Sequence, residues 1–454
     1  MKARKVLSFI IIILLLIIGA LALVYYKTDI FKTNAQKFFK YANQNIEMLE
    51  LFNNECIQSI KNRRSNNPYE VNSSLSIRKG TDNYLITANT SAQNSNDITT
   101  DIDFQYNDKD IINFMLVKKS NLIGAKIDEL ANGYIAIKNN DIHTLAKDAG
   151  IEDVSNIPEN INWVSLLDIL YIQESDERYL IDTYSQFLLD NTKKENYSRE
   201  ESGLKIDDKI HMVTGYKLEL SEKETKELIK KLLTSVRDDD ARTVNLISSK
   251  MKLLNIPQKY SEPAAIREYI TKLIDKVDKF QATDAKYLEI TVYMENAQTI
   301  QTNIKVKNGN VFKFIIKRDE NKLCIVQENP NKDLEQSENV FLKYLGNMQE
   351  ITLSNEMGED KNSVIIKFNA KFYNNLSVEY NSRIAIVESV EKNTDFDDST
   401  KLVLNEIEPN NLKKLCNMIK ERIPKIIADK KAMMTGNFEY EEEQTQSENN
   451  ALEN

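Results

Sequence analysis

An uninterrupted apolar run, VLSFIIIILLLIIGALALV at residues 6–24, constrains this chain more than any other feature. Its 19 residues include one polar side chain, Ser8. At about 1.5 Å of rise per residue, a helix of this length crosses the hydrocarbon core of a bilayer. Three basic residues precede the run: Lys2, Arg4 and Lys5. The positive-inside rule therefore predicts a cytoplasmic N-terminus at residues 1–5, a transmembrane signal-anchor helix at residues 6–26 and an extracellular C-terminal bulk.

The same run also fits a cleaved signal peptide, because Ala20 and Ala22 match the small-x-small cleavage pattern. The apolar core of a signal peptide is usually about 7–15 residues long, and this run continues past the candidate cleavage site. Its length favours a retained single-pass anchor, and cleavage after Ala22 stays open. The first cysteine, Cys56, lies too far along the chain for a lipoprotein. Both interpretations place the rest of the chain outside the cytoplasm, and the retained anchor holds it at the cell membrane.

The exported part must rely on a hydrophobic core. It has three cysteines, Cys56, Cys324 and Cys416, and an odd number cannot all pair within one chain. With 454 residues, the chain is long enough for two domains. Its formal net charge of −9 lacks the basic footprint that nucleic-acid binding needs. The short basic stretch KNRR, at residues 61–64, is interpreted as a solvated charge cluster, so no nucleic-acid partner is expected.

Alternating apolar residues predict antiparallel strands in the first half of the exported chain. A helix at residues 34–52 comes first, within a juxtamembrane segment at residues 27–60. Runs such as DNYLITANT and ITTDIDFQY then alternate apolar and polar positions, as the strands of an antiparallel meander do. Helices are predicted within residues 162–191, where the only tryptophan, Trp163, is expected to anchor the core.

The second half repeats this plan. Helical patterns occupy residues 241–254 and 263–280, and further alternating strands follow. Asn308-Gly309 lies between two alternating runs and is the strongest short hairpin signal in the chain.

Two strand-to-helix joints, one in each half, look alike. In YKLELSEKETKELIKKLL, Ser221 can cap the helix while Glu224 reaches back to form a capping box. In LVLNEIEPNNLKKLCNMI, Pro409 suits the first helical position. The similarity predicts that each half ends in a strand followed by an amphipathic helix.

This repetition predicts an α+β protein in which an N-terminal transmembrane helix is followed by two exported domains, each an antiparallel meander sheet packed on helices. The join is placed at three consecutive aspartates, residues 238–240, that interrupt an apolar stripe. The last residues contain six glutamates but no lysine or arginine after residue 436, which predicts a disordered acidic tail. The predicted segments after the juxtamembrane helix are the first domain at residues 61–239, the second at 240–434 and the tail at 435–454.

Three stretches resemble a group of uncharacterised, membrane-anchored envelope proteins of Clostridium-like Firmicutes. They are the basic N-terminus with its anchor, NGYIAIKNNDIHTLAKDAGI at residues 132–151 and GYKLELSEKETKELIKKLL at residues 215–233. The resemblance implies location and architecture and carries no chemistry. As a fold analogy, the predicted sheets on helices are also similar to lipoprotein carriers of the LolA type.

The sequence offers little of the chemistry that catalysis or metal binding requires. His143 and His211 are the only histidines and lie apart from other metal-ligand residues, so both are expected to be ordinary solvated or half-buried side chains. Carboxylate clusters at residues 207–208, 238–240 and 395–398 lack the glycine and terminal glutamate of an EF-hand. Nucleotide-binding and nucleophile motifs are missing. No catalytic, cofactor or metal residue is therefore assigned, and calcium binding at a cluster stays open.

These observations favour a non-enzymatic binding or scaffold protein of the bacterial cell envelope, held in the membrane through residues 6–26 and contacting an envelope protein or a lipid. The alternative is a carrier or sensor of a lipid or other apolar ligand. A hydrolase comes third, because a site of two carboxylates far apart in the sequence needs no local motif. The carrier predicts an apolar cavity, the scaffold an exposed patch, and the hydrolase a cleft with converging carboxylates.

Overall fold

The computed structural model describes most of the chain after the apolar run. The described residues are 33–44, 55–127, 133–164, 168, 171–206, 209–239, 241–306, 310–317, 321–330, 344, 346–358, 361–391, 395–398 and 401–435. The predicted membrane anchor at residues 6–26 and the acidic tail from residue 436 on lie outside them. Among the described helices, none combines the length and apolar character needed to cross a bilayer.

The strands of the described residues form one sheet of 16 strands, in the order β16-β6-β5-β4-β3-β2-β1-β15-β14-β13-β12-β11-β10-β9-β8-β7. Its neighbouring strands are antiparallel except β6 and β16, which are parallel. The strand bounds are β1 Tyr69–Lys79, β2 Asp82–Asn94, β3 Asp97–Tyr106, β4 Lys109–Lys119, β5 Leu122–Lys126, β6 Tyr134–Lys138, β7 Tyr197–Ile206, β8 Lys209–Ser221, β9 Lys286–Glu295, β10 Gln298–Val306, β11 Asn310–Lys317, β12 Lys322–Gln327, β13 Met348–Met357, β14 Ser363–Phe372, β15 Leu376–Ile386 and β16 Lys401–Val403.

Two meanders, β1 to β6 and β7 to β15, join in the middle of this sheet. β1 pairs with β15 along its whole length, from Tyr69 opposite Ile386 to Lys79 opposite Leu376. The α+β class and the antiparallel meanders are thus confirmed, but the expectation of two separate sheets was wrong. The reason is that helices fill the chain between β8 and β9, which interrupts the strand pattern without interrupting the sheet. The domain division between residues 239 and 240 stays a prediction, and it falls inside the second meander.

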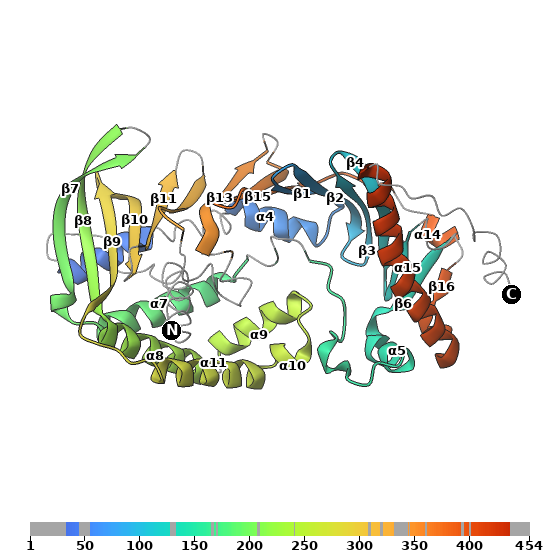
Figure 1. Ribbon diagram of the computed structural model, residues 1–454, viewed down its shortest axis with the longest axis horizontal. Coiled ribbons are helices and arrows are strands. Elements are labelled where there is room, and N and C mark those ends of the chain that lie inside the picture. Colours follow the sequence, from blue (N-terminus) through green and yellow to red (C-terminus); the bar gives the residue numbers. More distant parts are fainter. Residues whose placement is uncertain are drawn as a thin grey trace.

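Helices cover the concave face of this curved sheet (Figure 1). Their bounds are α2 Asn34–Gln44, α4 Glu55–Arg64, α5 Ile142–Asp148, α7 Glu174–Asn191, α8 Glu222–Asp238, α9 Thr243–Leu253, α10 Gln258–Ser261, α11 Pro263–Asp278, α14 Asp395–Asp398 and α15 Pro409–Thr435. Of the predicted juxtamembrane segment, α2 lies in the largest core cluster, where Phe38, Phe39 and Tyr41 are buried. Helix α2 is therefore part of the sheet's own core.

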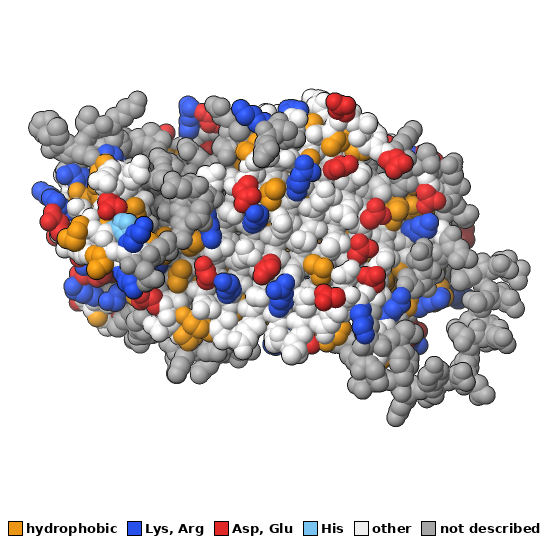
Figure 2. All heavy atoms as spheres, turned by 90° about the horizontal axis from the view of Figure 1, so that it is seen from above, with side chains coloured by type: hydrophobic (Ala, Val, Ile, Leu, Met, Phe, Trp, Pro, Cys, Tyr) orange, Lys and Arg blue, Asp and Glu red, His pale blue; other side chains and the backbone are white. Residues whose placement is uncertain are grey.

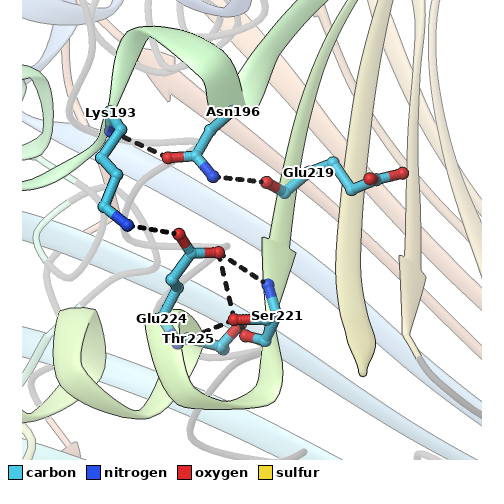
Figure 3. A network of polar contacts seen from close by, with 6 residues as sticks. All are labelled: Lys193, Asn196, Glu219, Ser221, Glu224 and Thr225. Carbon is cyan, nitrogen blue, oxygen red and sulfur yellow. Dashed lines mark hydrogen bonds and ion pairs between the residues drawn. The ribbon is translucent and has the colours of Figure 1, made fainter. Parts of the chain in front are cut away.

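The predicted capping box at the start of α8 is confirmed (Figure 3). The Ser221 hydroxyl accepts a hydrogen bond from the Glu224 backbone N–H at 3.2 Å, and the Glu224 carboxylate accepts one from the Ser221 N–H at 3.0 Å. Lys193 forms an ion pair with Glu224 at 3.2 Å, and the Asn196 amide donates to the Glu219 carbonyl at 3.0 Å. The helix thus starts directly at the end of β8, with its first N–H groups satisfied.

The two similar strand-to-helix joints are not equivalent in space. β8 has 13 residues and lies between two antiparallel neighbours, whereas β16 has 3 residues and pairs parallel at the edge of the sheet. The helix start at Pro409 is confirmed. The predicted hairpin is also confirmed, since β10 and β11 pair up to Val306 opposite Asn310, and its turn lies outside the described residues.

Candidate functional site

A patch of apolar side chains in the middle of the concave face is the candidate site. It has six members, here termed the central strip: Leu75, Ile77, Ile86, Phe368, Val378 and Tyr380. Sheet register brings them together, since Leu75 lies opposite both Tyr380 and Ile86, and Phe368 lies opposite Tyr380. Directly opposite side chains on neighbouring strands are within contact range. The strip is therefore a continuous apolar surface across β14, β15, β1 and β2.

The central strip faces the helices but does not pack into a core. Side chains alternate along β1, so Leu75 and Ile77 share a face with Tyr69, which packs with Ile57 and Ile60 of α4. All six members of the strip are half-buried. None of them belongs to any of the four core clusters that the described residues form.

Packed cores border the strip along the same rows. On one side Leu353, opposite Phe368, joins the cluster beneath α4. On the other side Phe104, opposite Ile86, packs in a cluster with Ile426 of α15. The strip is therefore a bounded patch between two well-packed regions.

The convex face of the same strands is polar. Its side chains in β1 and β15 include Asn72, Ser74, Ser76, Glu379, Asn381 and Arg383. In Figure 2, which shows this face, hydrophobic side chains are scattered among charged and uncharged polar groups. The two faces of the sheet thus differ in the ligands they suit, and the concave face suits an apolar one.

A polar hollow of about 550 Å³ is a second candidate. It is lined by Asn321, Lys322, Thr352, Ser354, Asn355, Glu356, Met357, Lys367 and Asn369. Glu356 is the one carboxylate in this lining, and it is neutralised by an ion pair with Lys367 at 2.7 Å. The amide nitrogen of Asn355 has no hydrogen-bond partner among the described residues, and Asn355 is 1% exposed. A single paired carboxylate does not provide the two acid–base groups of a hydrolase.

Both histidines are half-buried, one of the two states that their sequence context predicts. A ring nitrogen of His143 lies 2.9 Å from the Ile157 carbonyl oxygen. His211 is half-buried, and its Nδ1 lies 3.0 Å from a carboxylate oxygen of Glu295. His143 is in α5 and His211 is in β8, and neither joins a second histidine or a cysteine among the described residues.

The predicted carboxylate clusters are held by cations and hydroxyls. Asp395 pairs with Lys126 at 3.0 Å, and Asp397 pairs with Lys119. Asp238 pairs with Arg237 at 2.7 Å, while Asp239 accepts from Thr243. Residues 207–208 and 240 lie outside the described residues. Within the described part of the chain, no group of three or more His, Cys, Asp or Glu side chains could hold a metal ion.

The sequence predicted the strand faces of β1 and β2 in the central strip, but not the strip itself. Leu75, Ile77 and Ile86 fall on the apolar side of alternating runs, whereas the runs that contain Phe368, Val378 and Tyr380 were predicted only to be strands. Nothing local indicates that residues about 300 positions apart pair side by side, because β1 meets β15 only in the folded sheet. The apolar strand around Cys324 and the apolar helix stripe around Cys416 predict that both thiols are buried. Cys324 is buried as predicted, whereas Cys416 is half-buried.

Comparisons with known proteins give a family and a set of remote structural likenesses. The sequence profile of a family described as "Family of unknown function (DUF6583)" matches residues 1–408. No curated protein matches the chain. A domain from Vibrio parahaemolyticus, described as a "putative outer membrane lipoprotein-sorting protein domain", has 10% identity and a TM-score of 0.20, with 79% of this chain and 97% of that chain covered.

Two further solved structures are similarly remote. A LolA superfamily protein from Nitrosomonas europaea has 8% identity and a TM-score of 0.18, with 74% of this chain and 96% of that one covered. A DUF1329 family protein from Desulfovibrio piger has 6% identity and a TM-score of 0.17, with 78% and 96% covered. Likenesses at this level carry no argument about function.

Proposed function

The chain belongs to the family of unknown function DUF6583, and we propose from its geometry that it is a non-enzymatic protein that binds an apolar ligand, such as a lipid chain, on the concave face of its sheet. The observation that carries this proposal is the central strip, a continuous row of half-buried apolar side chains outside every described core cluster. Covering such surface contributes about 25 cal/mol per Å², so a ligand on the strip stabilises the folded protein.

The strip favours ligand binding over a filled scaffold or a hydrolase. Contiguous apolar surface that a soluble domain leaves unpacked marks binding sites more often than single exposed residues do. The polar hollow, with its one neutralised carboxylate, supplies no comparable support for hydrolysis. A ligand chain between the sheet and its helices fits the alternative predicted from the sequence.

The first test is mass spectrometry of the purified protein, residues 33–435, for co-purifying lipid. The second compares Ile86→Glu with Leu85→Glu, because Leu85 is the adjacent residue of β2, equally half-buried but on the convex face. Removing one apolar side chain from a contact costs about 1.5–3 kcal/mol, so Ile86→Glu should weaken binding of an alkyl probe about tenfold or more. Leu85→Glu should bind as the parent does. Equal binding by both variants, with melting curves unchanged, would contradict the proposal.

We also propose the location that the sequence predicts, with residues 6–26 anchored in the membrane of a bacterial envelope and the sheet outside. The apolar run and the three basic residues before it support this. Protease added to intact protoplasts should digest everything after about residue 27. A mature N-terminus at Leu23, found by N-terminal sequencing, would instead show cleavage after Ala22.

A second candidate function, docking of an envelope partner, is favoured by the β7–β8 hairpin. β8 pairs with β9 only from Thr214 on, so its first five residues pair with β7 alone and extend beyond the sheet (Figure 1). On this arm Ile210 is 76% exposed and Met212 is 73% exposed. A photo-crosslinker attached at Met212→Cys should capture one defined partner in cells, and the same label at Ser76→Cys on the convex face should not. Equal labelling from both positions would remove this candidate.

A further inference from the structure

A half-buried group of basic side chains lies on the concave side near the start of β1. Lys61 and Arg64 come from α4, and Lys250 comes from α9. The sequence interpretation of residues 61–64 as a solvated charge cluster was wrong for these two positions, because the Arg64 side chain is 14% exposed and Lys61 is half-buried. Helix α4 turns them inward, since Ile57 and Ile60 on neighbouring positions pack against the sheet.

All three cations contact Asp168 or Tyr171. Arg64 forms an ion pair with the Asp168 carboxylate. Lys250 donates to the backbone carbonyl oxygens of Asp168, at 2.9 Å, and of Tyr171. The ammonium of Lys61 lies 3.2 Å from the centroid of the Tyr171 ring. The group is thus positioned by specific contacts rather than by chance proximity on a surface.

The charges of this group do not balance among the described residues. Arg64 pairs with the Asp168 carboxylate, whereas the ammonium groups of Lys61 and Lys250 form no ion pair with a described carboxylate. The C-terminal ends of α4 and α9 offset part of this positive charge, because each helix end acts as roughly half a negative charge. Burial lowers the pKa of Lys61, and it lowers the pKa of Lys250 as well, as expected where cations are poorly compensated. A half-buried surplus of this kind favours an anionic ligand.

The basic group lies near the start of β1, and the central strip begins further along the same strand. The Arg64 guanidinium is 5.3 Å from the ring centroid of Tyr69, the first residue of β1. Leu75 lies six residues further on, or about 20 Å at 3.3 Å per residue. Resting on the proposed apolar-ligand function, we infer that Lys61, Arg64 and Lys250 bind the anionic headgroup, a phosphate or a carboxylate, of an amphiphile whose hydrocarbon chain extends to the central strip.

Three probes separate headgroup from chain: hexadecyl phosphate, hexadecanol and inorganic phosphate. Each is titrated by calorimetry into the purified protein, residues 33–435. The protein should bind hexadecyl phosphate about tenfold more tightly than hexadecanol, because charge-assisted hydrogen bonds add to the same apolar contact. Lys61→Gln with Lys250→Gln should abolish this preference and leave the affinity for hexadecanol unchanged. Lys61→Arg with Lys250→Arg should retain it.

The matched control is Lys223→Gln on α8, which removes an exposed lysine that pairs with Asp284 at 2.8 Å, and it should bind all three probes as the parent does. Equal affinities for hexadecyl phosphate and hexadecanol, or a preference that survives in the double Gln variant, would overturn the headgroup site and leave the proposed function standing. Tight binding of inorganic phosphate without either amphiphile would show a site for free phosphate and overturn both. Binding of none of the probes would also overturn both.

Discussion

At the scale of single residues, Glu224 both starts a helix and makes stability depend on pH. The hydrogen bond from the Ser221 backbone N–H, aided by Lys193, holds the pKa of this carboxyl below its ordinary value. A carboxyl whose pKa is lower in the folded than in the unfolded state contributes stability above its unfolded pKa of about 4.3. That contribution is lost as the pH falls through the lower, folded pKa.

Glu224→Gln should therefore flatten the acid side of the stability profile. The amide oxygen of glutamine can still accept from the Ser221 N–H, so the cap keeps its geometry while the titrating group is gone. Urea unfolding between pH 6 and pH 3 should show a smaller loss of stability in the variant than in the parent. Ser221→Ala, which removes the other half of the box, should cost about 1 kcal/mol at neutral pH. Parallel pH profiles for Glu224→Gln and the parent would contradict this role.

A substitution at Gly124 tests how closely α14 packs on β5. A Cβ at this position would lie 2.4 Å from Cε2 of Phe396, and Phe396 is 1% exposed in a cluster with Tyr134. Overpacking of this kind typically costs 1–3 kcal/mol, so Gly124→Ala should lower the free energy of unfolding by about that much. The control is Gly203→Ala, where the nearest atom would be 3.4 Å away, at Ile210. Similar melting temperatures for both variants would mean that Phe396 is free to move.

At this scale the sequence predicted interactions between residues a few positions apart, and it did not predict contacts between residues far apart in the chain. The Ser221–Glu224 box depends on residues three positions apart, so the sequence contains all of it. The central strip and the basic group depend on contacts such as Leu75 with Tyr380 and Arg64 with Asp168, across 104 positions for the second pair. Such contacts follow from topology, and no local pattern encodes them.

At the scale of elements, β7 shows where alternation fails as a signal. Its sequence YSREESGLKI is mostly polar, because β7 is an edge strand and one of its sides pairs with nothing in the described sheet. Charged side chains at Arg199, Glu200, Glu201 and Lys205 suit such an edge, since they discourage pairing with another chain. The opposite edge is protected differently, by the shortness of β16. An edge strand lacks the apolar alternation that identified its neighbours, so the sequence did not predict it.

Helix α2 is predicted to be essential to the largest core. Tyr41 is 2% exposed, stacks on Tyr216 with ring centroids 5.6 Å apart, and lies among the residues of that core. Deleting a large buried aromatic side chain costs about 3–5 kcal/mol, so Tyr41→Ala should lower the free energy of unfolding by that amount. Tyr269→Ala on α11, where the side chain is 60% exposed, should change it by less than about 0.5 kcal/mol. Equal effects in denaturant melts would mean that α2 is only a connecting segment.

At the scale of the whole molecule, strand pairing across residue 239 determines which fragments can test the predicted domain division there. A fragment of residues 241–434 separates β9 from β8, and α11 from α8, which packs on it. It should show no cooperative transition in calorimetry. A longer fragment, residues 33–390, keeps β7 to β15 together with α2 and α7, which pack in the same core, and should melt cooperatively. A cooperative transition in the first fragment alone would support the two-domain division.

The pairing of β1 with β15 also has a consequence for biosynthesis. The Ser73 and Ser382 hydroxyls lie 2.8 Å apart although they are 309 positions apart in the chain. At about 5–20 residues per second, a ribosome needs roughly 15–60 s to make the stretch between them. Throughout that interval β1 is an open edge onto which a second nascent chain can add. Chaperone demand during translation should therefore peak between the appearance of β1 and that of β15. A polypeptide that extends through β15 is the shortest one in which β1 has both of its neighbours.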